Sequence, residues 1–423
     1  MVKLSCVFIA FFCLILPSQA QLSEIKSHTE ALCSSAFHGR GYVNSGDSLA
    51  SEYIKKYFEK NEIAPINGNY FQSFSFNVNT FPGNMDVVHN EKKLIPGKHF
   101  LVHPSSSGAV MQIIPKKISV KELLDSKVLL STIEQLQNDT LYNGVLLDFT
   151  KITADTLKLI QPIGEELSAI FPIIEVTDRK FTWSVSTKTF ANTYIQVQDS
   201  IYEEGATFDI NITSQFTRKH ESRNVMGIVP SKIKTDDFVV FTAHYDHLGR
   251  MGESTYFPGA NDNASGTAIL LEMARKIKDK PLNVNAVFIA FAGEEAGLIG
   301  SNYFVNHPEI QLQNIRFLIN TDIMGSGEEG ITVVNATLHD KAFQLLKKIN
   351  KKKKLVKEIK SRGPAANSDH YWFSQEGVPS FFIYTMGPNK NYHDIFDTYS
   401  NLSFAATENV FELIYAFAKK VKN

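Results

Sequence analysis

The feature that most constrains the fold is a regular alternation of apolar runs and amphipathic segments from about residue 223 onward. The runs DFVVFTAHYD, NAVFIAFAG, IRFLINTDIMG and PSFFIYT have the length and composition of buried strands. Between and after them, SGTAILLEMARKIKD, EEAGLIGSNYFVNH, DKAFQLLKKIN and FAATENVFELIYAFAKKV predict helices. This alternation predicts an α/β domain over residues 219–423, with a mixed, largely parallel sheet flanked by helices.

The first half of the chain has a different pattern. Residues 21–85 are predicted to form an N-terminal helical segment that packs on the α/β domain, because SGDSLASEYIKKYFEKNEI has apolar residues at helical spacing. From about residue 70, the runs FQSFSFNVNTF, KVLLSTI, NGVLLDF, FPIIEV and TYIQVQ predict short strands, with helices possible at 121–126 and 152–160. Residues 86–218 are therefore predicted to be an inserted, β-rich domain.

The N-terminus has the pattern of a signal peptide. Lys3 precedes the apolar run LSCVFIAFFCLIL, and Pro17 and the small residues of SQA follow it, so residues 1–20 are predicted to be removed by cleavage after Ala20. The alternative is an N-terminal membrane anchor. Cys33 would be the only cysteine of the mature chain, which excludes an internal disulfide. We therefore expect an exported protein, periplasmic or extracellular, with no membrane span after signal removal.

The charge balance excludes one class of partner. The chain has 43 basic and 44 acidic residues, so it has no basic excess with which to hold nucleic acid. The lysine-rich run at 347–360 is predicted to be a solvated helix end and turn.

Acids and imidazoles follow each predicted strand at its carboxyl end, where open α/β sheets bind ligands. They are His244 and Asp246, then Asp262, then Glu294 and Glu295, then Asp322, and finally Tyr392 and His393. Imidazole and carboxylate suit one or two zinc ions, and a carboxylate can bridge a metal pair. Motifs of the HExxH, CxxC, GxSxG and Walker types are absent from the sequence.

Neighbouring residues at a strand end point in different directions. One carboxylate of the pair Glu294–Glu295 could therefore bind metal while the other takes a proton from a metal-activated water. Asp246 lies two residues after His244, where it could accept the second ring N–H of that histidine. Each residue alone also fits an ordinary role, such as a loop histidine, an acidic helix start or a strand-end acid. His247, one residue out of phase, is predicted to be structural or a pocket contact.

Taken in order, AHYDHLG, PGANDNASG, AGEEAGLIGS, NTDIMG, SDHYWF and NYHDIFDT resemble the motifs of the co-catalytic zinc aminopeptidases. That family includes bacterial leucyl aminopeptidase, aminopeptidase Y and the glutamate carboxypeptidase type. The resemblance implies an exopeptidase that hydrolyses N-terminal residues of peptides with two Zn²⁺ ions. It implies one zinc on His244, Asp262 and Asp322, and the other on Glu295, His393 and the shared Asp262. It also implies Glu294 as general base, Asp246 in support, and a cis peptide after Asp262. Tyr392 could donate to the oxyanion of the tetrahedral intermediate or serve only in packing.

The resemblance also bears on the inserted region, since some family members carry a protease-associated domain at this position. One departure concerns the last motif, which reads Tyr-His-Thr-Pro in many relatives and YHDIFDT here, so the loop after His393 lacks a rigidifying proline. Two other functions remain open. They are a glutaminyl cyclase-like acyltransferase with a single zinc, and a catalytically silent binding module.

Overall fold

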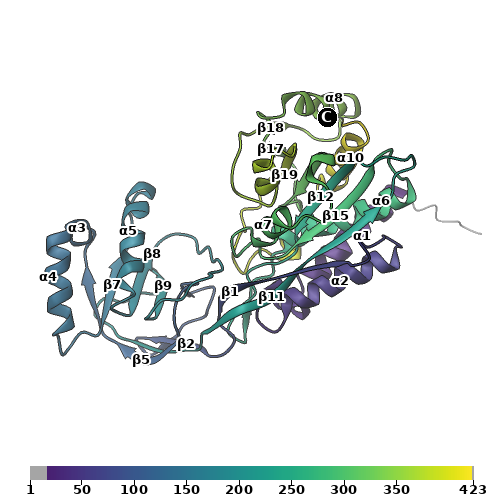
Figure 1. Cartoon of the computed structure of the whole chain (residues 1–423). Coiled ribbons are helices and arrows are strands. Elements are labelled where there is room, and N and C mark those ends of the chain that lie inside the picture. Colours follow the sequence, from purple (N-terminus) through teal and green to yellow (C-terminus); the bar gives the residue numbers. More distant parts are fainter. Residues whose placement is uncertain (1–16, 422–423) are drawn as a thin grey trace, which may run out of the picture.

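Two lobes joined by a long two-stranded ribbon make up the protein in a computed structural model that describes residues 17–421 (Figure 1). The large lobe contains residues 17–80 and 215–421, and the small lobe contains residues 81–214. The predicted signal segment 1–20 lies outside the described residues except for positions 17–20, which begin helix α1 (Pro17–Leu32). Within the described part of the chain, no helix combines the length and apolar character that a membrane crossing requires.

The large lobe is built on a mixed sheet of eight strands in the order β1-β11-β15-β12-β16-β19-β17-β18. Its centre, β15-β12-β16-β19, is parallel, and so is the edge pair β17-β18. The pairs β1-β11, β11-β15 and β17-β19 are antiparallel. The strands are β1 (Phe71–Thr80), β11 (Gln215–Val229), β12 (Phe238–His244), β15 (Asn285–Phe291), β16 (Ile315–Thr321), β17 (Gly330–Val334), β18 (Ile359–Ser361) and β19 (Ser380–Met386). The predicted α/β class with a largely parallel central sheet is confirmed.

Both faces of this sheet are buried, which explains why its strands are continuous apolar runs. Val239, Phe241 and Ala243 of β12 pack on one face, whereas Val240 packs on the other. The first face is covered by α1, α2 (Gly46–Lys60), α6 (Gly266–Asp279), α8 (Asp340–Lys353) and α10 (Thr407–Ala418), and the second by α7 (Ile299–Asn306) and α9 (His370–Gln375). The lysines at the end of α8 are exposed, as the sequence predicts.

The small lobe contains two sheets with a shared apolar core. One has the order β3-β2-β10-β5 and the other the order β4-β9-β8-β7-β6. Helices α3 (Val120–Leu124), α4 (Ser126–Gln137) and α5 (Ala154–Leu167) cover the outer face of the second sheet. The strands are β2 (Met85–His89), β3 (Lys92–Lys93), β4 (Phe100–Val102), β5 (Ala109–Ile113), β6 (Pro115–Ile118), β7 (Gly144–Asp148), β8 (Ile173–Thr177), β9 (Tyr194–Gln198) and β10 (Phe208–Ile212).

One strand prediction in this lobe is wrong. The run KVLLSTI belongs to helix α4, whose first turn is capped because the Asp125 side chain accepts the backbone N–H groups of Lys127 and Val128. Leu129, Ile133 and Leu136 then face the core at helical spacing. The helical region near the N-terminus is also interrupted, since a 3₁₀ turn at Ser35–Arg40 separates α1 from α2.

Candidate metal centre

The predicted ligand residues converge at the carboxyl edge of the parallel strands. His244 is the last residue of β12, Glu294 and Glu295 follow β15, and Asp322 follows β16. Asp262 lies in the short irregular helix Ala260–Ser265 between β12 and α6, and His393 follows β19. The helix after β15 starts only at Ile299, so both glutamates lie in a turn rather than in the predicted helix.

Asp262 lies between the two histidines. Its Oδ1 is 3.3 Å from Nε2 of His244, and its Oδ2 is 3.0 Å from Nε2 of His393. Asp322 approaches the same nitrogen of His244 at 3.4 Å, and Glu295 approaches that of His393 at 3.2 Å. The five side chains thus form two groups that share one carboxylate.

The donor set fits divalent cations. His244, Asp262 and Asp322 each offer a ligand atom within one small space, and the three residues are buried. Oxygen Oδ1 of Asp322 has no hydrogen-bond partner although it is buried. Imidazole nitrogens and carboxylate oxygens are common zinc ligands, and an unpartnered buried oxygen is costly unless a cation or a donor meets it. The residues His244, Asp262 and Asp322 therefore fit a zinc ion.

The pKa shifts of the candidate ligand residues also indicate a site suited to cations. Burial alone would lower the pKa of His244, but the carboxylates of Glu294 and Asp322 outweigh it and raise that pKa well above its ordinary value. Burial disfavours ionised Glu295, but His393 and a hydrogen bond from His247 prevail and lower its pKa to about 2. Buried acids that depend on neighbouring imidazoles for compensation are well suited to cations.

Glu294 differs from the other carboxylates because it lines the cavity beside the ligand groups and is not paired with a histidine. Burial raises its pKa well above the usual value for glutamate, and the nearby Glu295 adds to the effect, against the attraction of His244. A carboxylate with a raised pKa at a reaction cavity is suited to accept and return a proton. Burial also raises the pKa of Asp322.

Asp246 supports the site by a route that differs from the prediction. Its carboxylate is 3.8 Å from Nδ1 of His244, too far for a hydrogen bond, and that ring nitrogen is closer to the Asp246 backbone carbonyl, at 3.2 Å. The carboxylate instead accepts the backbone N–H groups of Glu294 at 3.2 Å and Glu295 at 3.3 Å. Tyr42 donates to it at 2.7 Å. Asp246 therefore fixes the turn that presents both glutamates.

The loop that carries Asp262 is held on both sides. The predicted cis peptide between Asp262 and Asn263 is confirmed. Asp397 accepts the backbone N–H groups of Asn261 at 2.9 Å and Asp262 at 3.0 Å. Burial raises the pKa of Asp397 to about 7, although these N–H groups and the Arg40 guanidinium favour its ionised form.

Arg40 is the buried cation beneath this loop, and sequence reasoning did not find it. Its guanidinium donates to the carbonyl oxygens of Leu32, Tyr245, Pro258, Gly259 and Asp262. The side chain is fully buried. Its partners lie as far as 222 positions away in the sequence, so no local pattern could have revealed this role.

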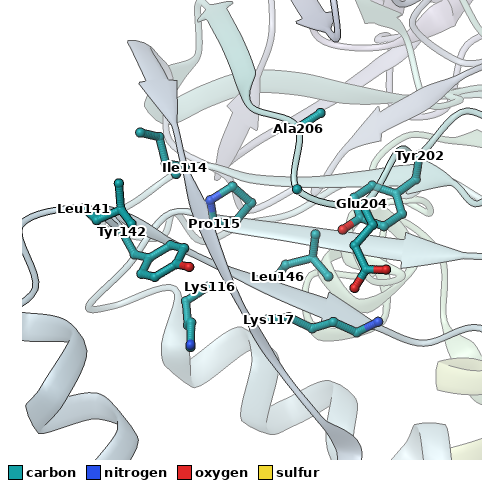
Figure 2. Close-up of a pocket in the computed structure, with 11 residues that line it drawn as sticks. Ile114, Pro115, Lys116, Lys117, Leu141, Tyr142, Leu146, Tyr202, Glu204 and Ala206 are labelled. Carbon is teal, nitrogen blue, oxygen red and sulfur yellow. The ribbon is translucent and has the colours of Figure 1, made fainter.

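A cavity of about 310 Å³ adjoins the ligand groups. Its walls include Glu294, Ile323, Arg362, Asn367, Phe382, Tyr384 and Tyr392. The ring of Tyr392 stacks on that of His393, with centroids 3.9 Å apart. A second cavity, of about 410 Å³, lies in the small lobe beside Lys116 and Lys117 (Figure 2). There Lys117 pairs with Asp148 at 2.9 Å, and Lys116 lies over the ring of Tyr142.

A largely parallel α/β sheet with histidines and carboxylates gathered at its carboxyl edge is the arrangement of a metal-dependent hydrolase. Comparison with known families agrees with this class: residues 224–418 match the model of peptidase family M28.

Two curated relatives illustrate the similarity. Aminopeptidase YwaD of Bacillus subtilis is 35% identical over 163 residues, which are 38% of this chain and 34% of that protein. A probable leucine aminopeptidase of Trichophyton verrucosum is 29% identical over 204 residues, or 45% of this chain and 53% of that protein. The matches thus span about a third to a half of these relatives.

Solved structures extend the similarity of the fold to both lobes. A zinc aminopeptidase from Bacillus subtilis superposes with a TM-score of 0.69 at 18% identity, covering 94% of this chain and 93% of that one. A peptidase M28 precursor from Shewanella amazonensis gives a TM-score of 0.67 at 14% identity, covering 95% and 97%.

Proposed function

We propose that this chain is an exported zinc-dependent aminopeptidase that removes N-terminal residues from peptides. The observation that carries the proposal is the position of Asp262, whose two oxygens face His244 and His393 separately. A carboxylate between two ligand groups supports a pair of zinc ions, with Asp262 shared between them. The names of the relatives, an aminopeptidase and leucine aminopeptidases, support action at the N-terminus.

His244, Asp262 and Asp322 would hold one zinc ion, and Glu295, His393 and Asp262 the other. When bound, zinc supplies Lewis acidity that polarises the scissile carbonyl and acidifies water. Glu294 takes the proton from the attacking water and returns it to the leaving amine. The raised pKa of this carboxyl suits both transfers. Asp246 keeps Glu294 in place through the backbone hydrogen bond at 3.2 Å.

Tyr392 and the cavity supply the remaining parts. The Tyr392 ring lies against His393 and lines the cavity, which supports a role for its phenol as a donor to the oxyanion of the tetrahedral intermediate. A cavity of about 310 Å³ has room for one amino-acid side chain, which favours an exopeptidase. Phe382 and Tyr384 contribute its aromatic wall.

The two ligand groups favour the hydrolase over a single-zinc glutaminyl cyclase. A cyclase needs one metal and no attacking water. Here a second set of candidate ligands, Glu295 and His393 around the shared Asp262, lies beside the first, and Glu294 lines the adjoining cavity. Because the candidate ligand residues and Glu294 are all present, a catalytically silent binding module is disfavoured as well.

The test compares substrates on the zinc-loaded full chain. Leucine p-nitroanilide and its N-acetylated form differ only in the free amine. We expect rapid release of nitroaniline from the first and little from the second, with two zinc ions per chain. A peptide with N-terminal glutamine provides the third arm. One zinc per chain with formation of pyroglutamate would identify a cyclase, and rapid cleavage of the acetylated substrate would exclude an aminopeptidase.

Export is a separate part of the proposal. The apolar run after Lys3 and the small residues before position 21 support cleavage after Ala20. N-terminal sequencing of the protein recovered from cells should start at Gln21. A mature protein that still begins at the initiator methionine and stays with the membrane would indicate an anchor instead.

A further inference from the structure

The loop that carries His393 is bound to a segment of the small lobe. The Trp183 carbonyl lies 2.9 Å from ring nitrogen Nδ1 of His393, and the backbone N–H of Trp183 donates to the His393 carbonyl at 2.9 Å. Lys180 forms an ion pair with Asp394 at 2.5 Å and donates to the carbonyl of Lys390 at 2.6 Å. We call residues 180–183 the clasp. It lies between β8 and β9, about 210 positions before the loop it holds.

The clasp itself is firmly fixed. The Trp183 side chain is buried, and its indole N–H donates to the carbonyl of Val102 in β4 at 2.8 Å. Its ring stacks on Phe257 of the large lobe, with centroids 4.6 Å apart. Trp183 is therefore anchored to both lobes before it meets His393, and this anchoring makes its carbonyl a defined partner for the imidazole.

The loop end of the contact is equally well held. Asp394 is 3% exposed and accepts the backbone N–H of Phe396 at 2.8 Å and that of Tyr392 at 3.3 Å. Lys180 supplies the positive charge for this buried carboxylate. In the motif that reads Tyr-His-Thr-Pro in many relatives, Asp394 stands at the threonine position and Ile395 at the proline position. In this chain the ion pair to the small lobe holds the loop in place of the rigid ring.

The hydrogen bond also determines which nitrogen of His393 faces the ligand group. A carbonyl can only accept, so Nδ1 must carry the proton, and in the neutral ring Nε2 is left as the lone-pair nitrogen. Nε2 is the nitrogen that lies 3.0 Å from Asp262 and 3.2 Å from Glu295. A partner that orients a ligand histidine in this way commonly sets the affinity for the metal.

We infer that the clasp is part of the metal centre, with Lys180 and Trp183 acting as positioning residues for His393, so that retention of zinc by the group Glu295, His393 and Asp262 depends on the small lobe. This inference rests on the proposed function, because it concerns zinc at that group. The ordinary alternative is that the contacts only join two lobes. In that case the variants would change stability and leave metal retention unaltered.

The experiment uses the full chain with Lys180→Met, Lys180→Arg and Trp183→Phe. The matched control is Lys117→Met, which breaks an exposed ion pair with Asp148 in the same lobe. Lys117 lines the small-lobe cavity (Figure 2). Each protein is loaded with zinc and titrated with a chelator, and the retained zinc is counted. Urea unfolding of the zinc-free proteins is measured in parallel.

We expect Lys180→Met and Trp183→Phe to lose one of the two zinc ions at a chelator concentration about 10- to 100-fold lower than wild type requires. Lys180→Arg, which can keep the ion pair, and Lys117→Met should behave as wild type. The clasp inference fails if wild type holds two zinc ions and both clasp variants hold them equally tightly. It also fails if their loss of zinc only follows a loss of zinc-free stability. If wild type binds no zinc, the proposed function itself fails.

Discussion

Ring nitrogen Nδ1 of His247 lies 2.7 Å from oxygen Oε1 of Glu295, whose other oxygen faces His393. His247 is fully buried and is not among the residues that line the cavity beside the ligand groups. Its contact makes it the residue that orients a proposed metal ligand, which sharpens the broad sequence prediction of a structural or pocket residue.

Substitution His247→Gln should therefore weaken zinc binding rather than abolish folding. Loss of the hydrogen bond frees Glu295 to turn away, and the expected loss of zinc affinity is about 10- to 100-fold. Chelator competition measures it. His339→Gln, at a partly buried histidine whose ring packs near Phe317 and Phe381, is the control. Equal zinc affinity in both variants would contradict an orienting role for His247.

Substitution Glu294→Gln should separate proton transfer from metal binding. Gln keeps the size of the side chain but cannot take a proton, so kcat should fall by about 100- to 10,000-fold while zinc content stays at the wild-type level. Steady-state kinetics and metal analysis on one preparation provide the test. Glu295→Gln should show the opposite order, with zinc lost first. Undiminished turnover in Glu294→Gln would exclude this residue as the base.

Substitution Arg40→Lys should destabilise the fold although it keeps the charge. Lysine has three donors, whereas Arg40 meets five carbonyl oxygens. At least two buried carbonyls lose their donor at roughly 1–3 kcal/mol each, so the free energy of unfolding should fall by about 2 to 6 kcal/mol. Urea unfolding measures this change. Arg218→Lys, at an exposed site, should cost almost nothing.

His370 should make stability depend on pH in the acid range. Burial lowers the pKa of its imidazole to about 4, and neither ring nitrogen has a hydrogen-bond partner. The unfolded chain, with the ordinary pKa near 6.5, therefore binds a proton that the folded chain does not, and stability is lost as pH falls from about 6.5 to about 4.

The measurement is the difference in free energy of unfolding between wild type and His370→Gln. As pH falls from 7 to 4, the free energy of unfolding of wild type should decrease by about 3 kcal/mol more than that of the variant. The reason is that only wild type carries the titrating imidazole. Urea titrations at several pH values provide the data, and the other titrating groups of the chain cancel in the comparison. A difference that does not change with pH would contradict the prediction.

The sequence allowed much of the large lobe to be predicted, because its information is local. An apolar run followed by an acid or a histidine marks a strand and its carboxyl edge, and His244, Asp262 and Asp322 lie together as that pattern predicts.

What escaped prediction depends on contacts between distant positions. Arg40 and Trp183 look ordinary in their own segments, and each acquires its role from carbonyls or rings that only the folded chain brings near. Helix α4 escaped for another reason. KVLLSTI is apolar enough for a strand, and the capping contacts from Asp125 favour the helix.

The pairing of Thr80 with Gln215 places the two ends of the small lobe side by side on the ribbon of β1 and β11. In topological terms, the small lobe is an elaborated hairpin loop. A tight turn could replace residues 81–214 without moving a strand of the eight-stranded sheet. Such a shortened chain would keep all the ligand residues but would lose the carbonyl that orients His393. The lobe easiest to remove by design would then be one that the active site cannot spare.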